Sequence, residues 1–149
     1  MTKDEIATFI SIDMENYVDD RVTAGESPEE ARRVAGSQMA ILFPNGSPAP
    51  GQLLYQVIDD EDAVVGFLWI GPPMSEEPGA KYWVWNVEIE ESYRGRGLGR
   101  AAMALAEDAA RAHGATELGL SVFGHNPVAR RLYESMGYVT KTVQMRKSL

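Results

Sequence analysis

The sequence contains no cysteine and only two histidines, His113 and His125. Disulfides, thiolate nucleophiles and thiolate metal sites are therefore excluded. Two histidines are too few for a histidine-based metal centre unless carboxylates complete it. The sequence also lacks an apolar run long enough to cross a membrane, and its first residues, MTKDEIATF, carry acids where a signal peptide needs bases and an apolar core. We therefore expect a cytoplasmic protein that holds no metal.

Basic residues are also scarce, because 14 Lys and Arg stand against 22 Asp and Glu, which gives a net charge of −8. This balance argues against nucleic acid as a partner and weakly favours a cationic substrate through long-range attraction. The length of 149 residues and the hydrophobic content of 44% fit a soluble globular protein with one core. We expect one domain over residues 1–149.

The apolar pattern alternates between helical and strand spacing along the chain. The first helix has a capping box at Thr2 and Glu5, and its acids, Asp13 among them, are expected on the outer side. Ser27 and Glu30 suggest a second capping box. The expected helices span about 2–22, 28–42, 97–113 and 127–136, and the expected strands span 53–58, 64–70, 82–90, 116–123 and 138–145, with a loop over 71–79.

The strand over 82–90 is the centre of this plan. Alternation places Trp83, Trp85, Val87 and Ile89 on one face and Glu88 on the other, unless a bulge changes the phase. In the helix after it, the buried stripe is expected to consist of Leu98, Ala102, Leu105, Ala109 and Ala112. A strand, a helix and a further strand in succession imply a parallel pair of strands.

Between the central strand and that helix, the chain reads Arg94-Gly95-Arg96-Gly97-Leu98-Gly99-Arg100. Glycine permits positive φ and a close approach of the backbone to a ligand. A helix start offers unpaired N–H groups and the positive end of a dipole. Arginines concentrated in an acidic chain add to the attraction of an anion. The segment therefore predicts a phosphate-binding turn at a helix N-terminus.

A second motif follows, in which Asn126, Ala129, Leu132, Tyr133, Gly137 and Tyr138 keep the spacing Asn-x-x-Ala-x-x-Leu-Tyr-x-x-x-Gly-aromatic. Together with the glycine-rich turn, this motif resembles the GNAT superfamily of acyl-CoA-dependent N-acetyltransferases. The resemblance covers about residues 82–145. It implies an α/β fold of α+β type, with a mixed, mostly antiparallel central sheet flanked by helices. The first strand of the family would be short or absent here.

The resemblance also implies a cofactor, acetyl-CoA, held as co-substrate between the central strand and the next strand. Main-chain groups of Val87, Glu88 and Ile89 would pair with its pantetheine amides, as an added strand would. The turn formed by Arg94, Gly95, Arg96, Gly97, Leu98, Gly99 and Arg100 would hold the pyrophosphate. Asn126 would reach the cofactor, and Tyr133 would lie near the sulfur. Dimers are common in the family, so a homodimer is possible.

Acetylation requires a neutral amine, whereas a lysine-like amine has a pKa of about 10.4 and is mostly charged at pH 7. Some family members carry a glutamate five residues before the Asn motif, but Ser121 occupies that position here. We expect Glu88 to act as the base, with Glu90 or a water held by Ser121 as substitutes. Tyr133 would protonate the leaving thiolate. The acceptor would be a small-molecule or peptide amine.

Two other functions remain open from the sequence. A non-catalytic module that senses acyl-CoA would keep the glycine-rich turn and Asn126 but lack a working base. A dinucleotide-binding protein is less favoured, although Gly97 to Ala102 fits that fingerprint, because the acidic Glu117 would open the next strand rather than close it.

Overall fold

The computed structural model describes residues 1–74 and 81–149. Most of the predicted loop over 71–79 lies outside the described residues. The elements are α1 (Lys3–Thr23), α2 (Pro28–Leu42), a 3₁₀ turn (Pro44–Gly46), β1 (Leu53–Ile58), β2 (Val64–Gly71), β3 (Lys81–Ile89), a 3₁₀ turn (Glu91–Tyr93), α3 (Leu98–Ala112), β4 (Glu117–Leu120) and α4 (Pro127–Ser135).

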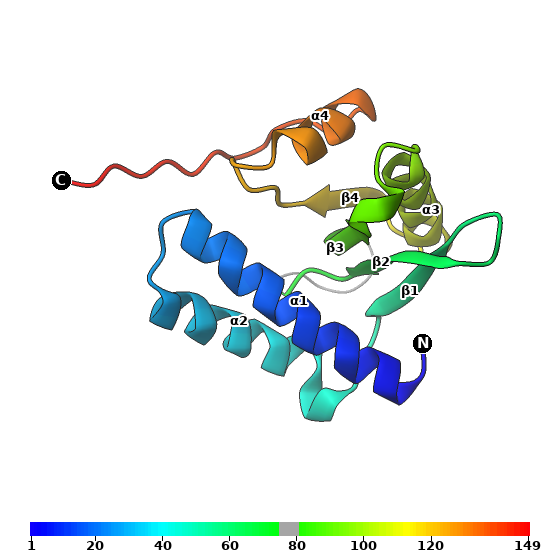
Figure 1. Cartoon of the computed structure of the whole chain (residues 1–149), viewed down its shortest axis with the longest axis horizontal. Coiled ribbons are helices and arrows are strands. Elements are labelled where there is room, and N and C mark those ends of the chain that lie inside the picture. Colours follow the sequence, from blue (N-terminus) through cyan, green and yellow to red (C-terminus); the bar gives the residue numbers. More distant parts are fainter. Residues whose placement is uncertain (75–80) are drawn as a thin grey trace.

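The strands form one sheet in the order β1-β2-β3-β4. The pairs β1–β2 and β2–β3 are antiparallel, and β3–β4 is parallel. Helices α1 and α2 cover one face of this sheet, and α3 covers the other (Figure 1). The expected mixed, mostly antiparallel sheet flanked by helices is confirmed. In the described part of the chain no strand precedes α1, as expected.

The helix starts follow from side-chain caps. The Thr2 side chain accepts from the backbone N–H of Glu5 while the Glu5 carboxylate accepts from the backbone N–H of Thr2, so the first capping box is confirmed. At α2, Ser27 caps the backbone N–H of Glu30, but the carboxylate of Glu30 accepts from Arg33 instead. The second capping box is therefore only half formed, because an ion pair one helical turn away takes its carboxylate.

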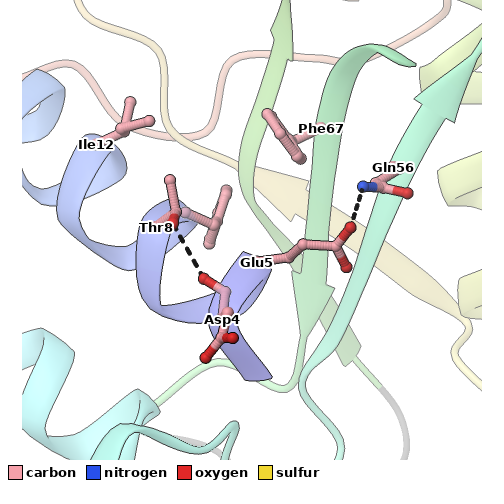
Figure 2. A pocket seen from close by; sticks show the side chains of 7 residues that line it. Asp4, Glu5, Thr8, Ile12, Gln56 and Phe67 are labelled. Carbon is pink, nitrogen blue, oxygen red and sulfur yellow. Dashed lines mark hydrogen bonds between the residues drawn. The ribbon is translucent and has the colours of Figure 1, made fainter. Parts of the chain in front are cut away.

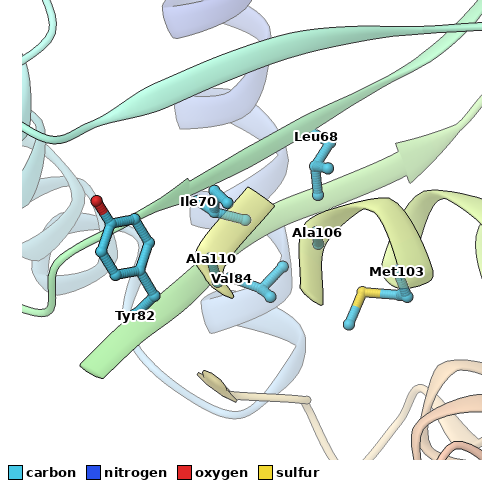
Figure 3. Packing of buried hydrophobic residues seen from close by; sticks show 7 residues of the cluster. All are labelled: Leu68, Ile70, Tyr82, Val84, Met103, Ala106 and Ala110. Carbon is cyan, nitrogen blue, oxygen red and sulfur yellow. The ribbon is translucent and has the colours of Figure 1, made fainter. Parts of the chain in front are cut away.

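The core between the sheet and α3 contains Leu68, Ile70, Tyr82 and Val84 from the strands and Met103, Ala106 and Ala110 from the helix (Figure 3). The predicted stripe of α3 is confirmed at Ala102 and, in part, at Ala109, and it is wrong at Leu105 and Ala112, which are exposed. Ala102, Met103, Ala106 and Ala110 are its buried residues, whereas Leu105 is 63% exposed. Alanines one turn apart let the helix approach the sheet closely, and this close packing decides which side of α3 faces the sheet.

A β-bulge in β3 reverses the predicted facing of its second half. Trp69 pairs with Asn86 and Ile70 pairs with Val84, so Trp85 is an extra residue on β3. Trp85 packs with the α1 and α2 core, whereas Val87 packs with the α3 core. The expectation that Trp85 and Val87 share a face is therefore wrong. After the bulge, Asn86 and Glu88 both contact α1.

The C-terminal strand predicted over 138–145 is also wrong, because residues 138–149 contain no helix or strand. β4 is shorter than expected and ends at Leu120. A strand needs a neighbour that completes its hydrogen bonds, and this segment runs away from β4 (Figure 1). Its side chains Val139, Val143 and Met145 are exposed, and Arg146 donates to the carbonyl of Gly25.

Within residues 1–74 and 81–149, no helix has the length and apolar content needed to span a bilayer.

Candidate active site

The pairing between the two parallel strands stops partway along β3. The ladder between β3 and β4 runs from Lys81↔Glu117 to Val84↔Leu120 and stops there. β3 continues to Ile89, and its other edge stays paired with β2 as far as Gly66↔Ile89. The main chain of β3 from Trp85 to Ile89 thus has no ladder with β4. We call this stretch of β3 without a β4 ladder the opening; the family resemblance implies that the cofactor lies there, along Val87, Glu88 and Ile89.

The glycine-rich turn lies at the end of this opening, between β3 and α3. Gly95 has φ 77° and Gly97 has φ 80°, and Gly97 is the N-cap of α3. Both are left-handed conformations that favour glycine. A Cβ built on either residue would have no atom of the described chain within 4 Å. The turn therefore exposes its backbone beside the N–H groups that open α3, which is an arrangement suited to an anion.

Each arginine of the turn makes a hydrogen bond within the protein. Arg94 Nε donates to the carbonyl of Ile89 at 2.8 Å. Arg96 donates to the carbonyl of Ser92 at 3.3 Å, and its guanidinium lies over the Tyr93 ring. Arg100 donates to the hydroxyl of Ser135 on α4. A guanidinium has five N–H donors, so these bonds fix the turn and leave donors for a ligand.

Helix α4 lies against the start of α3, where Leu132 faces Gly99. Asn126 is its N-cap, and Oδ1 accepts from the backbone N–H of Ala129 at 3.1 Å. Tyr133 packs against the α3 core, with its ring 5.9 Å from that of Tyr138. Burial raises the pKa of the Tyr133 hydroxyl above its usual value, so this group stays protonated at neutral pH.

Glu88 faces the other side of the opening, toward α1. Its carboxylate accepts from Asn16 Nδ2 at 3.5 Å. Two residues earlier on β3, Asn86 donates its side-chain amide to Asp13 Oδ1. The described residues show no hydrogen bond between Glu88 and Tyr133. The structure thus joins the turn to α4, and Glu88 to α1.

Asp13, which accepts from Asn86 beside Glu88, was not among the residues that the sequence singled out. Its side chain is buried, with 8% exposure, instead of lying on the outer side of α1. Burial raises its pKa from 3.8 to about 6, and the nearby charge of Glu88 acts in the same direction, whereas the Asn86 hydrogen bond lowers the pKa. The sequence spacing does indicate this burial, because Asp13 lies four residues from both Phe9 and Tyr17 on the apolar stripe of α1.

The loop after β4 contacts the C-terminal half of α1. His125 Nε2 lies 2.8 Å from Asp20 Oδ1, and the His125 ring stacks on Phe123. The Phe123 ring lies 6.3 Å from that of Tyr17. These contacts join the segment that precedes Asn126 to the C-terminal half of α1.

Two clefts lie outside the opening. One, of about 260 Å³, is formed between the N-terminal half of α1 and the β1–β2 hairpin (Figure 2). Phe9 and Phe67 line it, and Glu5 accepts from Gln56 across it. The other, of about 550 Å³, adjoins the glycine-rich turn and is lined by Asp59, Asp60, Glu61, Ser92, Tyr93, Arg96 and Leu98. Only the second touches the predicted cofactor turn.

The acidic turn over 59–62 is closed by its own side chain, because Asp59 Oδ1 accepts from the backbone N–H groups of Glu61 and Ala63. Across residues 1–74 and 81–149, no group of three or more His, Cys, Asp or Glu residues could hold a metal ion.

Comparison with known proteins identifies the arrangement. A sequence model of the acetyltransferase (GNAT) family matches residues 13–138. The uncharacterized N-acetyltransferase YycN of Bacillus subtilis is 33% identical over 150 residues, which span 100% of this chain and 96% of YycN. YdgE of the same organism, another uncharacterized N-acetyltransferase, is 30% identical over 100% of this chain and 95% of YdgE. A crystal structure of YycN superimposes with a TM-score of 0.89 and covers 100% of this chain and 95% of that one.

Proposed function

The chain belongs to the GNAT family and is an acyltransferase, and from that premise we propose that it transfers an acetyl group from acetyl-CoA directly to a primary amine. One observation carries the proposal. The β3–β4 ladder stops at Val84 and Leu120, and the end of β3 leads into a positive-φ glycine turn at the N-terminus of α3. An unpaired strand edge and an anion-binding helix start thus adjoin each other.

Acetyl-CoA contains groups that match both the edge of β3 and the start of α3. Its pantetheine amides would hydrogen-bond the main chain of β3 at Val87, Glu88 and Ile89, as an added strand does. Its pyrophosphate would bind the N–H groups of the turn over 95–100, with charge from Arg94, Arg96 and Arg100. Asn126 Oδ1 is used by the helix cap, so any contact with the cofactor would come from its amide nitrogen.

The acceptor must lose a proton before it attacks. Glu88 lies on the face of β3 that meets α1, and we assign it to accept the proton from the ammonium group. Glu90 is exposed and follows the end of β3, so it is less well placed. Ser121 follows β4 directly and could hold a water in place of a carboxylate base.

The leaving thiolate needs a proton, and Tyr133 is assigned to donate it. Burial keeps its hydroxyl protonated, and the thiolate becomes basic enough to take that proton only as the carbon–sulfur bond breaks. A packing role accounts for the ring of Tyr133, which contacts the α3 core. The hydroxyl is therefore the atom to test.

The proposal is tested by calorimetric titration of the protein with acetyl-CoA. Gly97→Trp should abolish saturable binding, because the indole would fill the space where the pyrophosphate would lie. Gly46→Trp is the matched control, since Gly46 has φ 73° and no atom of the described chain within 4 Å of its Cβ position, but lies in the turn after α2. Equal loss in both variants, or no binding by the unmodified protein, would refute the assigned site.

Two alternatives make different predictions. A sensing module would bind acetyl-CoA with the same dependence on Gly97 but would transfer nothing. A dinucleotide-binding protein would need an acid near the turn, yet Glu117 pairs with Lys81 at the opposite end of β3 from the turn. NADH should therefore give no heat of binding in the same titration.

A further inference from the structure

Helix α1 and strand β3 meet through two carboxyl groups and two amides. On α1, Asp13 and Asn16 lie about one turn apart on the same side. On β3, Asn86 and Glu88 both contact this side because the bulge at Trp85 changes the phase of the strand. Asn86 donates to Asp13, and Asn16 donates to Glu88. The bulge and the helix together bring Asp13 and Glu88 into one group.

A carboxyl group at position 13 is not needed for this packing. An asparagine side chain also has an oxygen that could accept the hydrogen bond from Asn86. A buried ionised carboxylate is unfavourable unless it is paired, and the charged group that acts on Asp13 is Glu88, which carries the same sign. On its other side α1 packs against α2, which contributes the buried Ala31 and Ala35 there.

The four side chains also lie beside the stretch of β3 that has no ladder with β4. Asn86 and Glu88 follow Val84, the last residue of β3 that pairs with β4. Glu88 belongs to the stretch, Val87 to Ile89, to which the pantetheine arm is assigned, and Asn86 adjoins that stretch. An amine that reaches the acetyl group from the α1 side would therefore meet Glu88, with Asp13 behind it. A metal ion is not the expected ligand, because within the described ranges no group of three such ligands occurs.

Resting on the proposed acetyl transfer, we propose that Asp13 is a positioning residue that acts through Glu88, and that the two carboxyls form one unit that accepts the proton of the acceptor ammonium. The like charge of Asp13, fixed by Asn86, favours a proton on the unit and directs the ammonium toward it.

The proton balance is complete. The ammonium gives one proton to the Glu88–Asp13 unit and becomes a neutral amine, whose nitrogen attacks the thioester carbonyl carbon. The new C–N bond forms, the C–S bond breaks, and the thiolate takes a proton from Tyr133. The nitrogen loses a second proton to solvent as the amide forms, and Tyr133 regains one from solvent. Release of the first proton resets the unit, so one proton is produced in each turnover.

The test compares two probe amines, the strongly basic butylamine and the weakly basic methoxyamine, which is already mostly neutral at pH 7. Asp13→Asn keeps an oxygen for Asn86. It should lower kcat/KM for butylamine by about 100-fold. It should leave kcat/KM for methoxyamine and the affinity for acetyl-CoA nearly unchanged. Asp19→Asn, at an exposed position on the same helix, should change neither. Equal loss with both probes would show a structural role and overturn the proposal, as would no loss with butylamine.

A second measurement does not depend on turnover. Carboxyl ¹³C NMR should show Asp13 titrating in two steps, which merge into one step at lower pH in Glu88→Gln. An Asp13 signal unaffected by Glu88→Gln would overturn the pair, whether or not either probe is an acceptor. Failure of the unmodified protein to bind acetyl-CoA would instead overturn the proposed function, so the two failures are distinguishable.

Discussion

At the scale of single residues, the proposed chemistry depends on a few polar groups that the fold removes from water. Asp13 is the clearest case, because its carboxyl is buried beside that of Glu88 and, among the described residues, no cation pairs with it. Tyr133 is the second, since its hydroxyl is partly buried at the junction of α3 and α4. Burial of this kind costs stability, and it also changes the pH at which a group gives up its proton.

Asp13 should make the protein less stable as pH rises. Its pKa increases from 3.8 in the unfolded chain to about 6 in the folded one, so between these values the folded state keeps a proton that the unfolded state has released. Each pKa unit corresponds to about 1.4 kcal/mol, and the loss by pH 7 is therefore about 3 kcal/mol.

Urea denaturation across this pH range provides the measurement. Relative to the unmodified protein, Asp13→Asn should gain stability progressively from about pH 4 to pH 6, whereas Asp19→Asn, exposed on the same helix, should follow the unmodified curve. A constant difference between Asp13→Asn and the unmodified protein over the whole range would show that Asp13 ionises normally.

Tyr133→Phe removes the hydroxyl while keeping the ring that contacts the α3 core. We expect kcat to fall by about 100-fold, which is the lower end of a general-acid contribution, with acetyl-CoA affinity unchanged. Rapid-quench and steady-state kinetics give kcat, and calorimetry gives the affinity. An unchanged kcat would mean that water, and not Tyr133, protonates the thiolate.

At the scale of elements, the site depends on how helices begin and on where one strand is interrupted. Gly97 caps the start of α3, Asn126 caps the start of α4, and the extra residue Trp85 places Asn86 and Glu88 on the α1 side of β3. The two helix starts lie where the sequence predicted them, at about residues 97 and 127, because glycine, asparagine and a following proline have local conformational preferences. The opposite directions of the Val87 and Trp85 side chains could not be predicted from the sequence, because the pairing of β3 with β2 decides where a bulge forms.

The other differences between prediction and structure also separate local interactions, which the sequence predicts, from contacts between distant elements, which it does not. The Thr2 cap is a local interaction and was predicted correctly, whereas the rotation of α3 depends on how closely its alanines approach the sheet. The segment over 138–145 has strand-like alternation, but alternation alone provides no neighbouring strand. Asp13 was assigned to the outer side of α1 because it is charged, although its spacing from Phe9 places it on the buried stripe.

The Asn126 cap allows stability and cofactor binding to be separated. Asn126→Ala should lower the free energy of unfolding by about 1 kcal/mol, because the backbone N–H of Ala129 loses its acceptor. Ser27→Ala is the matched control, since Ser27 caps α2 in the same way, away from the glycine-rich turn. Denaturation measures stability, and calorimetry measures acetyl-CoA affinity.

We expect weaker acetyl-CoA binding only in Asn126→Ala, because its amide nitrogen is assigned to the cofactor. If both variants lose the same stability and neither loses affinity, Asn126 is a helix cap alone.

At the scale of the whole molecule, two layers of helices perform different tasks. On one face of the sheet, α3 supplies the core and presents its N-terminus to the opening between β3 and β4. On the other face, α1 supplies Asp13 and Asn16 and holds the loop after β4 through Asp20 and His125. Cofactor and acceptor would thus approach the end of β3 from different sides, as direct transfer between them requires.

The central claim is acetyl transfer to an amine, and thiol release tests it most directly. Because the chain contains no cysteine, a thiol-reactive dye reports only the CoA set free. The protein is incubated with acetyl-CoA and, in turn, a polyamine, an aminoglycoside, an amino acid, a lysine peptide and buffer alone. We predict thiol release that requires both protein and one of these amines, with the N-acetylated amine identified by mass spectrometry. Saturable acetyl-CoA binding with no thiol release above buffer for any amine would contradict transfer and favour a sensing module.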